Sequence, residues 1–141
     1  MMQDTYNPDE LLKGLAAQES IEAYVVFNND GVPLKYFKKN PTGDKTKDQT
    51  QEKAVHQSAL FQDLWNVASK VLKQEQRFQG ENEVECMRLR TKHSFEYIVT
   101  QSGDFTIVVK QLCGKAIEEY RILLEEIAKI QAEAEDEKKK K

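Results

Sequence analysis

The sequence predicts an α+β fold with one five-stranded antiparallel sheet on which helices pack. Two short segments, residues 29–31 and 102–104, place a glycine between apolar runs, which is the pattern of a β-hairpin turn because glycine tolerates a positive φ. Other segments repeat their apolar residues at steps of three and four, which indicates amphipathic helices. The expected order is helix, two strands, helix, three strands and a last helix.

The first helix is expected to begin at Asn7. This residue can cap the helix, and Pro8 suits the first helical position because its backbone needs no hydrogen-bond donor there. Asp9 and Glu10 then place negative charge at the positive end of the helix dipole. The apolar face of this helix is short and ends near Ser20.

The first hairpin joins two predicted strands, residues 21–27 and 32–37. Its second arm contains Pro33, which lacks a backbone donor and so confines that arm to an edge of the sheet. Lysines at an edge discourage another chain from pairing there, and this arm carries Lys35, Lys38 and Lys39. One edge of the sheet is therefore expected to be protected.

A long central helix is predicted over residues 52–73, with a wide apolar arc that indicates packing on more than one side. Three strands are predicted after it, over residues 84–91, 95–101 and 105–112. In the first of these strands, alternation puts Met87 and Leu89 on one face. The residues expected on its other face are Cys86, Arg88 and Arg90.

The last helix is predicted over residues 115–135, followed by a frayed, charged tail. Its apolar residues alternate in steps of four and three: Ala116, Tyr120, Leu123, Ile127, Ile130 and Ala134. This heptad pattern is compatible with a coiled coil or with a helix packed on its own sheet, and the two alternatives carry equal weight. We divide the chain into a domain over residues 1–113 and a helical extension over residues 114–141.

The composition is typical of a soluble globular protein, with 32% charged residues and a formal net charge of −3. Nucleic-acid binding is not expected, since such proteins usually carry a basic excess. No apolar run is long enough to span a membrane, and the first residues do not have the pattern of a secretion signal. Cys86 and Cys113 are interpreted as small buried or half-buried thiols, and a cytoplasmic location is expected.

The sequence contains no constellation of residues that predicts catalysis, a metal site or a cofactor. His56 and His93 are isolated, and residues 43–46 resemble only the end of a phosphate-binding loop, without its first glycine. No nucleophile motif is present, and the paired acids of the last helix indicate a solvated face. The chain is therefore predicted not to be an enzyme.

Two features have both a structural and a contact interpretation. The basic residues around Arg88 and Arg90 are either ordinary charges of a strand face or part of a protein contact. Trp65 is either a core residue, which we favour, or an anchor in a contact with a partner.

Several stretches in this order resemble the roadblock family of dynein light chains. The first hairpin, residues 25–35, is similar to that family's first hairpin, and residues 40–42 to its loop before the central helix. Residues 87–92 resemble its x-R-x-R strand with a basic turn, and residues 105–111 resemble its closing strand. The resemblance covers residues 9–112. The chain departs from the family pattern in a longer loop at residues 43–51 and in the added last helix.

The resemblance implies a non-catalytic adaptor that forms a homodimer, or a heterodimer with a paralogous light chain. In such dimers, the third strands pair into one continuous sheet and the central helices pack together. Here the third strand has no proline or glycine, so its edge is fit for pairing. The residues expected at the dimer interface are Phe61, Leu64, Trp65, Ala68, Val71, Cys86, Met87, Arg88, Leu89 and Arg90.

The first functional hypothesis is a light-chain subunit of a dynein motor complex. It would bind a dynein intermediate chain and help assemble or anchor the motor or its cargo in microtubule-based movement, in the cytoplasm, on the cytoskeleton or in the axoneme of a cilium. The alternative is a roadblock-type scaffold that regulates or anchors a small GTPase. A third hypothesis, a small-molecule sensor, requires converging inward polar groups that the sequence does not indicate.

Overall fold

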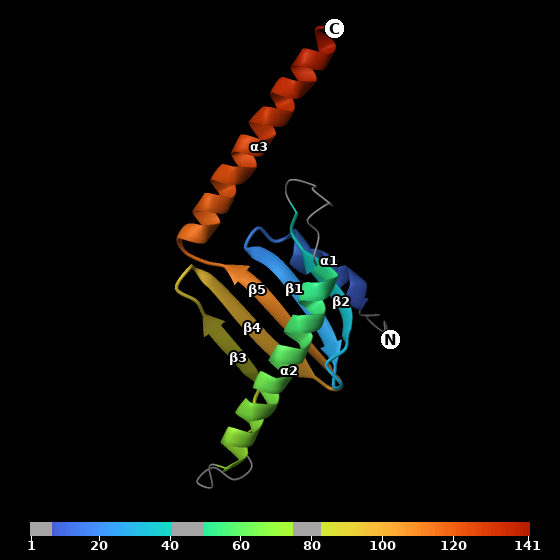
Figure 1. Ribbon diagram of the computed structural model, residues 1–141, viewed down its shortest axis with the longest axis vertical. Helices are drawn as coiled ribbons and strands as arrows, with labels where there is room; N and C mark the ends of the chain where they lie inside the picture. The colour runs from blue at the N-terminus through green and yellow to red at the C-terminus, as the bar shows by residue number, and fades with distance from the viewer. Residues whose placement is uncertain (1–6, 41–49, 75–82) are drawn as a thin grey trace, which may run out of the picture.

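The computed structural model describes residues 7–40, 50–74 and 83–141 (Figure 1). In order along the chain, the elements are α1 (Pro8–Ala17), β1 (Ile21–Asn28), β2 (Pro33–Lys38), α2 (Thr50–Gln74), β3 (Cys86–Arg90), β4 (Phe95–Ser102), β5 (Phe105–Leu112) and α3 (Lys115–Lys139). This order and the antiparallel sheet confirm the predicted fold class. The expectations for residues 43–46 and for most of the 43–51 loop fall outside the described residues. None of the described helices is long and apolar enough to cross a membrane.

The five strands lie in the order β2-β1-β5-β4-β3, so β2 and β3 form the two edges of the sheet. The prediction that the arm containing Pro33 is an edge strand is therefore confirmed. Pro33 is the first residue of β2 and lies opposite Phe27, where the pairing register shifts. A missing backbone donor disrupts the ladder least at such a position.

The hairpin between β1 and β2 closes as its sequence predicts. The side-chain oxygen of Asn28 accepts hydrogen bonds from the backbone N–H groups of Asp30 and Val32, both at 3.0 Å. Gly31 has a φ of 73°. It also faces α2, since a Cβ at this position would lie 3.8 Å from the Cα of Ala59. The tip of the hairpin thus lies against one flank of α2.

Helices cover the two faces of the sheet unequally. In Figure 1, α2 crosses the front of the sheet, and α1 lies behind it next to β1 and β2. The buried core forms between α2 and the front face, where alternate residues of β1, β4 and β5 point inward. Its buried members are Val25, Phe27, Ala54, Trp65, Val99 and Val108.

α3 differs from the expectation in its length and its placement. It continues to Lys139, through residues predicted to be a frayed tail, because glutamate and lysine are good helix formers and the final lysines complement the helix dipole. Only its base approaches the body, and beyond that point the helix projects away from the sheet (Figure 1). Of the two alternatives, packing along its own sheet is thus not the arrangement observed.

β3 is shorter than predicted, five residues instead of the segment 84–91. Val84, which precedes β3, still packs against the core as a partly buried residue. Cys113 is half-buried as expected, whereas Cys86 is exposed because it lies on the outward face of an edge strand. The interpretation of Cys86 as a buried or half-buried thiol is therefore wrong.

Candidate functional site

One side of α2 carries a row of apolar side chains that the protomer does not bury. The row, called here the α2 stripe, consists of Leu60, Leu64, Val67 and Val71. Steps of four, three and four residues align them along the helix axis. Leu60 is 67% exposed and Val67 58% exposed, so the stripe is separate from the row Ala54, Ser58 and Trp65 that enters the core.

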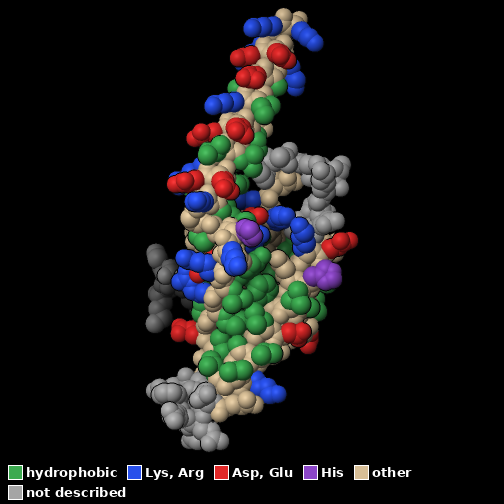
Figure 2. Space-filling model, turned by 60° about the vertical axis from the view of Figure 1, so that its left-hand side comes forward, with side chains coloured by type: hydrophobic (Ala, Val, Ile, Leu, Met, Phe, Trp, Pro, Cys, Tyr) green, Lys and Arg blue, Asp and Glu red, His purple; other side chains and the backbone are tan. Residues whose placement is uncertain are grey.

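The α2 stripe lies on the flank of the helix that faces β3. On the opposite flank, Ala59 faces Gly31 at the tip of the first hairpin. On the stripe's flank, the ring of Phe61 packs against the ring of Tyr97 in β4, with centroids 5.4 Å apart. Tyr97 is paired with Leu89 of β3, so apolar and aromatic side chains continue from α2 across β4 to the edge of the sheet. Figure 2, in which the β3 side comes forward, shows hydrophobic side chains gathered there below the base of α3.

Beside these apolar side chains, β3 presents an unpaired backbone edge. Among the described residues it pairs with β4 alone, so its outer N–H and C=O groups face away from the sheet. Leu89 is 43% exposed on the α2 side, next to the half-buried Met87. An edge strand without proline, beside exposed apolar side chains, is suited to pairing with another chain.

The other face of β3 holds an ion-pair cluster. Arg88 Nε lies 2.8 Å from Glu96 Oε1, and an Arg90 nitrogen lies 3.7 Å from Glu96 Oε2. The side chain of Glu96 is only 7% exposed. The hydrogen bond from Arg88 and the charges of both arginines hold the pKa of Glu96 below its ordinary value, despite desolvation. Glu96 thereby fixes both arginines along the sheet edge.

The residues expected at a dimer interface are distributed over three environments. Trp65 is 4% exposed and belongs to the core, as the favoured interpretation of that residue expects. The half-buried residues are Phe61, Ala68 and Met87. The exposed residues are Leu64, Val71, Cys86, Arg88, Leu89 and Arg90. Sequence reasoning did not select Leu60 and Val67, although their spacing with Leu64 and Val71 is a detectable signal.

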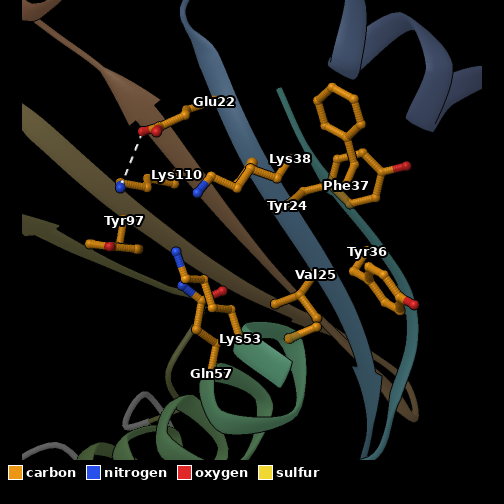
Figure 3. Close-up of a pocket in the computed structure, with 12 residues that line it drawn as sticks. Glu22, Tyr24, Val25, Tyr36, Phe37, Lys38, Lys53, Gln57, Tyr97 and Lys110 are labelled. Atoms are coloured by element: carbon orange, nitrogen blue, oxygen red, sulfur yellow. Dashed lines mark ion pairs between the residues drawn. The ribbon is translucent and has the colours of Figure 1, made fainter. Parts of the chain in front are cut away.

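A pocket opens at the other end of α2, between its first two turns and the sheet (Figure 3). Its volume is about 240 Å³. Lysines from three separate elements line it: Lys38 of β2, Lys53 of α2 and Lys110 of β5. Lys110 forms an ion pair of 3.2 Å with Glu22. Converging polar groups of this kind were not indicated by the sequence.

The described residues contain no cluster of histidine, cysteine and acidic side chains that could hold a metal ion. His56 and His93 are both exposed and lie on different elements, α2 and the turn between β3 and β4. Cys113 donates a hydrogen bond to the carbonyl oxygen of Ser94 at 3.1 Å.

An α+β domain with an open edge strand beside an exposed helix is the class that these observations define. The family model of the Roadblock/LC7 domain matches residues 8–111, and the chain belongs to this family. Its members are typically non-catalytic scaffold or regulatory proteins. No curated protein matches the chain by sequence.

Several solved structures with the same fold come from bacteria. A Roadblock/LC7 domain from Streptomyces avermitilis has a TM-score of 0.56 at 15% identity, covering 90% of this chain and 99% of that chain. MglB from Myxococcus xanthus has a TM-score of 0.54 at 11% identity, covering 86% and 90%. The gliding protein MglB from Thermus thermophilus has a TM-score of 0.55 at 11% identity, covering 88% and 93%. At sequence identities this low, the structural similarity establishes a common fold and nothing more.

Proposed function

We propose that this chain is a non-catalytic subunit that dimerises through β3 and the α2 stripe. The observation that carries the proposal is that an unpaired strand edge and a row of exposed apolar side chains lie on the same side of the domain. Antiparallel pairing of two β3 strands would join the sheets of the protomers into one continuous sheet. A two-fold axis at that junction would also bring the two α2 stripes together.

The physical chemistry of the surface favours a second protein chain as its occupant. Pairing of β3 would satisfy backbone groups that otherwise require water, and contact between stripes would remove Leu60, Leu64 and Val67 from solvent. Full burial of one such side chain contributes roughly 1.5–3 kcal/mol. Trp65 would support this interface from below, since it anchors α2 to the sheet. The match to a solved MglB described as having a tetrameric arrangement is in keeping with self-association.

For the dimer's cellular role, we propose a light-chain subunit of a dynein motor complex that binds an intermediate chain. The resemblance of the first hairpin and of β3 to roadblock dynein light chains supports this role. α3, which projects from the body with exposed apolar side chains, supplies additional surface for a partner. The role carries with it a location in the cytoplasm, on the cytoskeleton or in an axoneme.

A second candidate role is a scaffold that regulates or anchors a small GTPase. The fold similarity to MglB from Myxococcus xanthus and to the gliding protein MglB from Thermus thermophilus supports this role, which we propose with the same weight as the first. Both roles use the same dimer. They differ in the partner that the assembled dimer retains: a motor intermediate chain or a nucleotide-loaded GTPase.

The test combines a pair of charge substitutions with partner capture. Leu64→Glu with Val71→Glu should give a folded monomer by light scattering, because two charges would be buried at the interface. Val55→Glu is the matched control, since Val55 is 49% exposed on the opposite flank of α2 and should leave the dimer intact. If the double variant remains a dimer, the interface assignment fails. Capture of an intermediate chain or of a loaded GTPase by the unaltered protein then decides between the two roles.

A further inference from the structure

The pocket in Figure 3 gathers more positive charge than the described residues of its lining neutralise. Lys38 at the end of β2, Lys53 in the first turn of α2 and Lys110 in β5 direct their amines into the same space. These residues are remote in sequence, so their convergence is a property of the tertiary structure. Glu22 is the one carboxylate among the described residues that line the pocket.

Glu22 forms an ion pair with only one of the three lysines, Lys110. Its Oε2 lies 3.2 Å from Lys110 Nζ, and both side chains are about a quarter exposed. Lys38 instead lies next to Lys53, another cation that lines the same pocket. The closeness of Lys53, desolvation and the positive charges of Lys53 and Lys110 lower the pKa of Lys38, while the negative charge of Glu22 opposes the change. Two amines thus lie close together without a carboxylate of their own in the pocket lining.

The remaining walls of the pocket suit a small group with several acceptor oxygens. Gln57, one turn after Lys53, adds an amide donor, and the ring of Tyr97 forms one side. Val25 and Ala54 supply an apolar floor. The first turn of α2 contributes the positive end of a helix dipole. A volume of about 240 Å³ accommodates a compact group and is below the usual range for drug-sized ligands.

We propose that this pocket binds the phosphate group of a phosphate monoester. Such a group carries a charge of about −1.5 to −2 at pH 7 and offers three strong acceptor oxygens. This charge matches Lys38 and Lys53, which have no ion pair with a described carboxylate of the lining. A carboxylate would neutralise only one of them. Lysine is a common phosphate ligand because its amine acts as a point charge. The ester can belong to a small metabolite or to a phosphorylated side chain of a partner protein, and the chemistry of recognition is the same.

The first test measures binding by the full chain with O-phosphoserine and with a short phosphoserine peptide, by calorimetry at fixed ionic strength. Saturable binding is expected, with at least a tenfold loss of affinity in Lys53→Gln and in Lys38→Gln. Lys129→Gln, an exposed lysine of α3, is the matched control and should bind as the unaltered protein does. Binding of the free amino acid supports a small-molecule ester, and binding of the peptide alone supports a phosphorylated partner.

A second measurement, the rate of lysine acetylation, distinguishes binding of phosphate at this pocket from general screening of charge by salt. The amine of Lys38 should react faster with an acetylating reagent than that of Lys129, and O-phosphoserine should protect it, as measured by mass spectrometry. Circular dichroism melting checks that each variant remains folded. The proposal is overturned if sodium chloride at equal ionic strength protects Lys38 as well, or if neither pocket variant changes affinity. This outcome is independent of the dimer, because the substituted lysines belong neither to β3 nor to the α2 stripe.

Discussion

Arg121 of α3 donates two hydrogen bonds to the carboxylate of Glu19, the second residue before β1. Arg121 Nε lies 2.7 Å from Glu19 Oε1, and its terminal nitrogen lies 3.2 Å from Oε2. Next to this pair, Lys39 Nζ lies 5.4 Å from the centroid of the Tyr120 ring. These contacts attach the base of α3 to the start of the sheet and so set the direction in which the helix projects.

Loss of this attachment should loosen the base of α3 without unfolding the sheet. In Arg121→Gln, we expect faster amide hydrogen exchange over residues 115–121 and little change in β1 and β5, because both partners of the ion pair are largely exposed. Lys129→Gln, further along the same helix, serves as the comparison and should leave exchange at the base unchanged. Unaltered exchange in Arg121→Gln would show that the apolar contacts at Tyr120 and Leu123 are sufficient.

Removal of α3 should leave a folded sheet. A chain ending at Gly114 loses the partly buried contacts of Ala116 and Tyr120 but none of the buried core residues, since α3 contributes no buried residue. We expect cooperative thermal unfolding with a loss of stability of about 2 kcal/mol, the scale of one apolar side chain. Non-cooperative melting of the truncated chain would place α3 in the core unit and contradict the division at residue 114.

Trp65 should be among the residues most sensitive to truncation. Trp65→Ala removes a large aromatic side chain from the buried cluster that also contains Phe27, and should cost about 3–5 kcal/mol in the free energy of unfolding. Val55→Ala, on an exposed flank of the same helix, should cost little, because alanine favours the helix. Chemical denaturation of both variants measures the difference. Equal costs would mean that Trp65 is a contact anchor and not a core residue.

The Glu96 cluster should make stability depend on pH in acid. Because the pKa of Glu96 is held below its ordinary value of 4.5, the folded state binds the proton less readily than the unfolded state. The stabilisation is thus complete above the ordinary pKa and is lost as pH falls through the lowered value. Melting temperatures measured from pH 6 downward should fall less steeply in Glu96→Gln than in the unaltered protein. Arg88→Gln should weaken the same dependence of melting temperature on pH. If both variants keep the pH dependence of the unaltered protein, carboxyl groups other than Glu96 cause it.

The local features of the fold were predictable, because their causes lie within a few residues. Asn28 and Gly31 specify the first hairpin, and Pro33 identifies an edge strand. The division of the α2 apolar arc was not predictable in the same way. The spacing of Leu60, Leu64 and Trp65 places all three on the apolar arc of α2. Only the position of the sheet decides which of them enters the core.

The pocket was not predictable either, for a similar reason. Lys38, Lys53 and Lys110 each have an ordinary local context, and they meet only because β2 and β5 flank β1 while α2 lies across the sheet. For β3, by contrast, the alternation of Met87 and Arg88 predicted the two faces correctly. Contacts that depend on neighbouring residues could be inferred from the sequence, and contacts between remote segments could not.

Sedimentation equilibrium of the unaltered protein at micromolar concentration tests the dimer most directly. The chain mass is 16.3 kDa. We expect a species of twice that mass, which Leu89→Glu with Met87→Lys converts to single chains, because charges on β3 would oppose pairing of the strands. A single species of 16.3 kDa in the unaltered protein would contradict the account, since the edge of β3 and the α2 stripe would then have no partner of their own kind.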